Sequence, residues 1–134
     1  MRNIFLPGAP ITTTHQMKQV NWKTRSFYEP PKVKQARAKL TAQLSPYRPA
    51  EPTQGAVNLT VEWFFPTKDK RKDGMPKTTR PDCDNMVKLL LDVMTALRFW
   101  NDDAQVTSLT LIKRWSEGEG GTLIQVKEHE EETQ

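Results

Sequence analysis

The most regular pattern in the chain is the alternation of residues 56–65. Every second residue of this stretch is apolar: Val57, Leu59, Val61, Trp63 and Phe65. Successive side chains of a β-strand point to opposite faces, so a period of two predicts a strand with one face in a core. Pro66 ends the pattern. Any fold of this chain therefore has to bury one face of a sheet.

Two further segments show the three-and-four spacing of amphipathic helices. The first begins at Pro30-Pro31, because proline suits an opening turn, and ends at Ser45-Pro46. The second covers residues 84–99, and its apolar stripe is unusually wide: Met86, Val87, Leu89, Leu90, Leu91, Val93, Met94 and Leu97. Such a stripe needs two partners, either the sheet and a second subunit or the two sides of one small domain that wraps the helix.

The remaining segments are shorter or irregular. We expect strands at 2–6, 104–115 and 122–127, and the last two read as a hairpin around the glycine-rich turn 117–121. Residues 11–28 look irregular. With 134 residues, the chain fits a single domain. The order of elements predicts an α+β fold in which a small mixed sheet of four to five strands packs against two helices.

Charge is distributed unevenly along the chain. Residues 1–49 hold nine Lys or Arg and one acid, whereas residues 81–134 hold five bases and eleven acids. The long loop 67–81 adds six cations that we predict to contact DNA: Lys68, Lys70, Arg71, Lys72, Lys77 and Arg80. This division suits an enzyme acting on a polyanion, with cations on phosphates and carboxylates on a metal. A solvated surface with chance asymmetry is the alternative.

Several classes of protein are excluded. No run approaches the roughly 18 apolar residues of a membrane helix, and the first residues lack the apolar region of a secretion signal, so we expect no membrane partner and a cytoplasmic location. The single cysteine, Cys83, has no internal disulfide partner, and His15 and His129 lie too far away to form a zinc site with it. His15 is interpreted as an ordinary loop histidine. Any metal is therefore expected on oxygen ligands.

Two pairs of aspartates flank the second helix, with Asp82 and Asp84 before it and Asp102 and Asp103 after it. Alternate residues of an extended segment point to one side, so Asp82 and Asp84 suit a hard cation such as Mg²⁺. Helix capping is the alternative for this pair, and an ordinary turn for the other. A helix of this length would hold the pairs about 25 Å apart. They meet either by a curling of the extended segment or across a dimer interface, and both remain open.

Lys88 lies four residues after Asp84, on the same face of the helix. It either pairs with that carboxylate or neutralises charge on a phosphate in a transition state. Phe99 and Trp100 are interpreted as core anchors, with base stacking as the alternative. Phosphate-loop, nucleophile-elbow and zinc-protease motifs are absent from the sequence. The consistent chemistry is metal-assisted attack of water on a phosphodiester.

The motif Arg80-Pro81-Asp82-Cys83-Asp84-Asn85-Met86-Val87-Lys88, followed by Asp102-Asp103-Ala104-Gln105-Val106, resembles the signature of the RusA family of Holliday-junction resolvases. The resemblance implies a homodimeric, Mg²⁺-dependent endonuclease that resolves four-way DNA junctions by symmetric paired nicks. It also implies a mixed α/β fold with active sites near the dimer interface. We expect this nuclease domain at residues 1–127 and a frayed acidic tail at 128–134.

Carried over position by position, the resemblance makes Asp82, Asp84 and Asp103 the metal ligands and Lys88 the catalytic lysine. Asn85 and Asp102 become supporting residues, and Mn²⁺ is the alternative to Mg²⁺. Residues 9–16 depart from the opening of some family members, so no DNA contact is carried over there. Two other functions stay open: a DNA-binding accessory module without catalysis, and a metal-dependent phosphohydrolase of nucleotides, which would need a pocket.

Overall fold

The computed structural model describes residues 2–13, 19–21 and 26–129. Its main sheet contains β1 (Arg2–Pro7), β4 (Val57–Thr67), β5 (Val106–Glu117) and β6 (Gly121–Glu128), in the order β1-β6-β4-β5. β4 runs parallel to β5 and antiparallel to β6, and β1 runs antiparallel to β6. The sheet is thus mixed and four-stranded, which confirms the predicted α+β fold.

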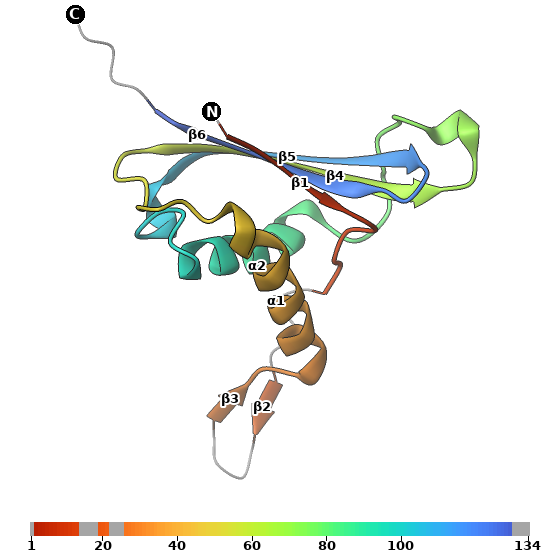
Figure 1. Cartoon of the computed structure of the whole chain (residues 1–134). Helices are drawn as coiled ribbons and strands as arrows, with labels where there is room; N and C mark the ends of the chain where they lie inside the picture. The colour runs from red at the N-terminus through yellow and green to blue at the C-terminus, as the bar shows by residue number, and fades with distance from the viewer. Residues whose placement is uncertain (1, 14–18, 22–25, 130–134) are drawn as a thin grey trace, which may run out of the picture.

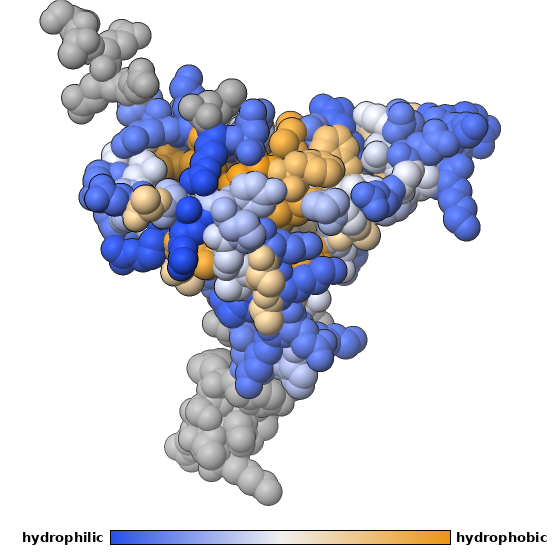
Figure 2. Space-filling model, viewed as in Figure 1, coloured by the Kyte–Doolittle hydropathy of each residue, from blue (hydrophilic) through white to orange (hydrophobic). Residues whose placement is uncertain are grey.

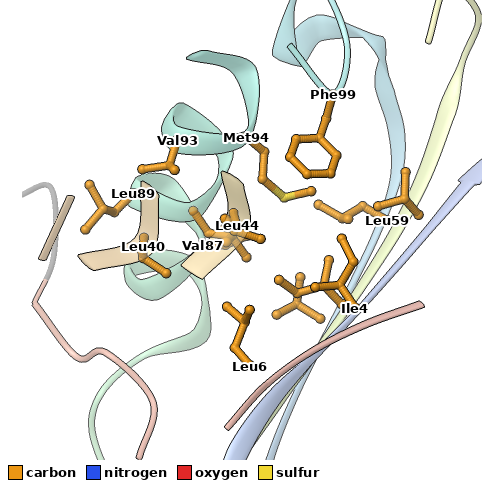
Figure 3. Close-up of a cluster of buried hydrophobic side chains, with 14 of the residues drawn as sticks. Ile4, Leu6, Leu40, Leu44, Leu59, Val87, Leu89, Val93, Met94 and Phe99 are labelled. Atoms are coloured by element: carbon orange, nitrogen blue, oxygen red, sulfur yellow. The ribbon is translucent and has the colours of Figure 1, made fainter. Parts of the chain in front are cut away.

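Helices α1 (Pro31–Leu44) and α2 (Cys83–Ala96) cover one face of this sheet (Figure 1). The alternation of β4 is confirmed, because its odd-numbered residues from Val57 to Phe65 are all buried. Their layer meets side chains from both helices and from β1, as the close-up in Figure 3 shows for Leu59, Leu44, Met94 and Ile4. The core is therefore a two-layer packing of helices on a sheet.

The wide apolar stripe of α2 is largely buried within one chain. Six of its residues are buried, some against the sheet and others against α1: Met86, Val87, Leu89, Leu90, Val93 and Met94. Figure 2 shows hydrophobic residues gathered in the middle of the molecule, where sheet and helices meet. The sheet and α1 of the same chain already bury these six side chains, so the stripe by itself gives no argument for a second subunit.

The predicted hairpin of the last two strands is wrong. β5 and β6 are consecutive in sequence, but β4 lies between them in the sheet. The connection crosses the end of β4 at Gly120, which has a φ of +79°, and a Cβ there would come within 2.4 Å of the Phe64 carbonyl oxygen. The turn therefore needs glycine because its backbone passes close to the end of β4 on the way from β5 to β6.

Several boundaries also differ from the prediction. Part of the segment taken as irregular forms a small antiparallel pair, β2 (Gln19–Asn21) and β3 (Ser26–Tyr28), beyond α1 and away from the main sheet (Figure 1). α2 ends at Ala96, and Arg98 follows with a positive φ of 66°. Short 3₁₀ turns occur as η2 (Ser45–Tyr47), η3 (Lys70–Lys72) and η4 (Asp103–Gln105). η4 replaces the first two residues of the strand expected from 104.

Two expectations concern the chain ends and one loop. Glu128 closes β6 and accepts a hydrogen bond from the Gly55 amide, so the expected tail begins inside a strand. His15 and residues 130–134 lie outside the described residues. In the part of the chain that the structure describes, no helix has the length and apolar character needed to span a membrane.

Candidate active site

Asp82 and Asp84 lie at the start of α2, on the surface. Asp82 is the N-cap residue, with an extended backbone (φ −75°, ψ 141°), and its carbonyl accepts the Met86 amide at 3.2 Å. Asp84 lies in the first helical turn, and both side chains are exposed. Negative charge is favourable at this end of a helix, because unpaired backbone amides and the helix dipole point outward here.

The capping explanation is not realised at this position. Within the described residues, the Asp82 carboxylate accepts no capping hydrogen bond from the first turn. An N-cap aspartate ordinarily stabilises a helix through that bond. Two surface carboxylates, two residues apart, therefore stand at the start of α2 with the favourable helix dipole but without a capping bond.

Lys88 lies one turn further along α2 and is exposed. No ion pair joins it to Asp84 among the residues described, so the simple salt-bridge alternative is not observed either. Between them lies Asn85, whose side-chain Oδ1 is buried without a hydrogen-bond partner in the described structure. A buried acceptor of this kind usually has a partner, and its place one residue after Asp84 adds another oxygen to this end of the helix.

Asp102 and Asp103 lie beyond the other end of α2 and have different environments. The Asp102 carboxylate caps η4 by accepting the Ala104 amide at 2.8 Å, in a capping box with Gln105. Asp103 is exposed and belongs to η4 itself. Partial desolvation raises the pKa of Asp103, and a hydrogen bond and charge from Asp102 and the charge of Asp92 act in the same direction. The turn explanation thus holds for Asp102 and leaves the Asp103 carboxylate for another task.

Gln105 fixes this turn through both ends of its side-chain amide. Its Nε2 donates to the carbonyl oxygens of Thr53 at 2.8 Å and Gly55 at 3.0 Å. Its Oε1 accepts the backbone amides of Asn101 at 2.8 Å and Asp102 at 3.0 Å. The segment before β4 and the segment before β5 are thereby tied together directly beneath the aspartates.

The two aspartate pairs do not meet within one chain. α2 has 14 residues, which at 1.5 Å per residue separates its ends by about 20 Å. In Figure 1 the helix runs beneath the sheet from the loop on the right to the turn on the left. Among the described residues, no three His, Cys, Asp or Glu side chains are close enough to hold one metal ion. The curling of the extended segment is not observed, so one chain offers the carboxylate pair at one end and Asp103 at the other.

The basic loop projects beyond the sheet, and its tip is hydrophilic in Figure 2. Five of its six predicted DNA-contacting cations are exposed: Lys68, Lys70, Arg71, Lys72 and Arg80. Arg71 forms an ion pair with Asp69, whose pKa is lowered mainly by that hydrogen bond. These positions are suitable for a phosphate backbone, since phosphate contacts require cations on a surface.

Lys77 is the exception among the six cations. Only 9% of it is exposed, and its ammonium lies 4.5 Å from the centre of the Trp115 ring and 5.1 Å from that of Phe65. Burial lowers the pKa of Lys77, with smaller contributions from Lys113 and Lys72. The ammonium of Lys77 donates to the Thr79 and Arg80 carbonyl oxygens and to the Thr79 hydroxyl, all in its own loop, so the structure gives this lysine a different set of partners from a DNA phosphate.

The structure also shows where the two aromatic residues after α2, the single cysteine and a lysine of β5 lie. Phe99 and Trp100 are core anchors, 2% and 0% exposed, and the Trp100 indole donates to the Thr95 hydroxyl at 2.8 Å. Cys83 is half-buried and packs against the core. The sequence analysis gave Lys113 no role, although the sequence contains a signal for one. Lys113 shares a strand face with Leu109, Leu111 and Trp115, so an ammonium lies on a face that is otherwise apolar.

Comparisons with known proteins agree on one family. A family profile described as "Endodeoxyribonuclease RusA" matches residues 7–127. The chain is 42% identical over 72 residues to the crossover junction endodeoxyribonuclease rusA of Lactococcus phage r1t, covering 52% of this chain and 55% of that protein. It is 36% identical over 55 residues to the protein of that name from Escherichia coli (strain K12), covering 41% of this chain and 46% of that protein. The matched part thus spans about half the length of these curated relatives.

Proposed function

The chain belongs to the RusA family of endodeoxyribonucleases, and from this premise we propose that it resolves four-way DNA junctions by metal-dependent hydrolysis of phosphodiesters. The observation that carries the proposal is the start of α2. Two exposed carboxylates, Asp82 and Asp84, stand there without a capping bond, one turn from Lys88, which is not paired with Asp84. A helix that needed acids only for stability would use Asp82 as its cap. In the cytoplasm, where we propose that it acts, the protein would meet its DNA substrate directly.

Each residue has a role in this proposal. Asp82, Asp84 and Asp103 would hold Mg²⁺, with Mn²⁺ as the alternative, because carboxylate oxygens are the ligands such hard cations prefer. The bound ion would supply charge stabilisation and a water of lowered pKa. Lys88 would bring its ammonium to the phosphate oxygens as charge accumulates on them. Asp102 supports Asp103 by capping the turn that carries it.

The separation of the acids supports a homodimer with shared sites. One chain offers Asp82 and Asp84 at one end of α2, whereas at the other end Asp102 caps η4 and Asp103 alone is not a cap, so a site of these three carboxylates needs a second copy. A two-fold axis beside β5 and α2 would reverse the helix direction and bring Asp103 of the partner subunit toward Asp82 and Asp84. β5 is an edge strand, and its exposed residues 107–110 include Leu109, 42% exposed. A symmetric pair of sites also matches a junction with two equivalent scissile phosphates.

The first experiment compares three substrates: a synthetic four-way junction, a linear duplex and free nucleotides, each with and without Mg²⁺ or Mn²⁺. We expect cleavage of the junction alone, only with metal, at two symmetric positions. Junction binding without cleavage under every condition would instead identify a DNA-binding accessory module. Hydrolysis of nucleotides with an intact junction would identify a phosphohydrolase.

The second experiment tests the shared site. Light scattering should give about twice 15.4 kDa. Asp84→Asn and Asp103→Asn should each be inactive alone. Refolding the two variants together should produce mixed dimers and restore nicking, because one of the two sites in a mixed dimer carries neither substitution. Without such restoration, each site would draw its acids from one subunit.

A further inference from the structure

Two lysines bind the backbone of residues 79–81, directly before Asp82. The Lys113 Nζ donates to the first and third carbonyl oxygens of this tripeptide, each at 2.7 Å. The Lys77 Nζ donates to the second at 2.7 Å and to the first at 3.4 Å, and it also bonds the Thr79 hydroxyl. Three consecutive carbonyls are thus all engaged by two ammonium groups.

Backbone pairing holds these lysines side by side. The Lys77 amide donates to the Lys113 carbonyl at 3.0 Å, and Pro76 and Arg114 form an antiparallel bridge next to it. The loop before Asp82 therefore follows the edge of β5 for a few residues and then turns into α2. The Lys113 ammonium reaches that turn from β5, and the Lys77 ammonium reaches it from the loop segment paired with β5.

The ammonium of Lys77 occupies a costly environment. A charged amine removed from water loses hydration, which hydrogen bonds and aromatic faces only partly replace. A methionine of similar length would fill the space against Trp115 and Phe65 without that loss. What the ammonium adds is directional hydrogen bonding to the tripeptide, so its distinctive contribution is the conformation of the loop.

We propose that Lys77 and Lys113 are positioning residues, which fix residues 79–81 so that Asp82 and Asp84 present their carboxylates together to a divalent cation. This inference rests on the proposed function. It removes Lys77 from the set of DNA contacts and adds Lys113, which lies on a strand distant in sequence, to the residues on which metal binding depends. Loop backbone that no partner holds would sample many conformations and weaken a site built on it.

The test uses the full-length protein with three substitutions. Lys77→Met and Lys113→Met remove one ammonium each, and Lys127→Met, at an exposed position of β6, removes the same charge elsewhere. Mn²⁺ binding is measured by calorimetry without DNA, and hydrogen exchange is followed in the peptide that contains residues 78–88. Junction binding is measured in EDTA, together with the thermal midpoint and the Mg²⁺ dependence of junction cleavage.

We expect Mn²⁺ affinity to fall about ten- to a hundredfold in both loop variants, the range seen when groups that orient metal ligands are removed. Exchange of the 78–88 peptide should quicken, while metal-free junction binding and the thermal midpoint stay close to those of Lys127→Met. Lys113→Arg should recover part of the metal affinity, because a guanidinium keeps donors for the same carbonyls.

Unchanged Mn²⁺ affinity in both loop variants would overturn the proposal, as would a loss of junction binding with metal binding intact, since the lysines would then be phosphate contacts. If Lys113→Met does not fold, Lys77→Met decides alone, and unfolding of both would make the role purely structural and overturn it as well. A wild-type protein that cuts no junction would contradict the proposed function, yet calorimetry and exchange would still test the positioning.

Discussion

The two ends of α2 carry the same residue types and use them in opposite ways. At the beginning, Asp82 has the position of a cap without the capping bond, and lysines from elsewhere hold the backbone. At the far end, the Asp102 carboxylate accepts a capping bond and Gln105 ties the turn to the segment before β4. Of the two aspartates there, only Asp103 has no part in holding the turn. An aspartate beside a helix thus says little about its role until its hydrogen bonds are known.

This difference separates acids for chemistry from acids for structure. Asp82, Asp84 and Asp103 make no capping bond to the backbone in the described structure, and Asp102 makes one. If the distinction is correct, substitutions at the two kinds of position should change different observables, activity in one case and stability in the other. Four predictions test it, in decreasing order of expected effect.

Asp84→Asn should abolish junction cleavage, with a loss of more than about a thousandfold, because an amide is a poor ligand for a hard cation whose charge stabilisation is worth several kcal/mol. Junction binding in EDTA should persist or strengthen, since a negative charge facing phosphate is removed. Gel-based cleavage and binding assays measure both. Cleavage at the wild-type rate would return this acid to a structural role.

Lys88→Ala should slow cleavage by roughly two to three orders of magnitude, the scale of losing one positioned charge stabiliser. Junction affinity should change little, which single-turnover kinetics at saturating protein will separate from the rate. Lys127→Ala on β6 is the matched control. Equal losses of rate and affinity would make Lys88 a phosphate contact instead.

Gln105→Leu should lower the free energy of unfolding by about 2 kcal/mol, because backbone groups of four residues lose a hydrogen-bond partner together. Urea denaturation followed by circular dichroism measures this. Gln125→Leu makes the same chemical change on β6 and should have a smaller effect. Similar values for the two would mean that the turn does not depend on the amide.

Asp102→Ala should reduce stability by about 1 kcal/mol through loss of its cap, and Asp102→Ser should recover most of it. Asp82→Ala should change stability by less than about 0.5 kcal/mol, as a surface position without a capping bond does. The same denaturation experiment gives all three values. A larger loss at Asp82 than at Asp102 would reverse the comparison between the two helix ends.

Much of the fold could be predicted from local patterns. The alternation of β4 and the spacing in α1 and α2 are properties of neighbouring residues, and so is the burial of Phe99 and Trp100. The strand order could not be predicted, because it depends on which strand fills the gap between β5 and β6. The small β2–β3 pair was missed because three-residue strands carry too little periodicity.

The sequence nominates the residues of the candidate site, which remain a prediction, but it does not give their arrangement in space. The motif places Asp82, Asp84, Lys88 and Asp103 in one family signature, but spacing alone left open how the two acid pairs meet. Lys113 was missed because its partners, the carbonyls of Thr79 and Pro81, are more than 30 positions away along the chain. Contacts between a side chain and a distant backbone leave little trace in a single sequence.

The pairing of β1 with β6 has a consequence for biosynthesis. β1 is synthesised well before β6, so its register, from Arg2 opposite Val126 to Pro7 opposite Gly121, can form only once β6 has been made. Translation at about 5–20 residues per second makes this interval several seconds or more. The sheet is therefore completed only after the candidate catalytic residues have been synthesised, and we expect a nascent chain that still lacks β6 to be unable to cut DNA.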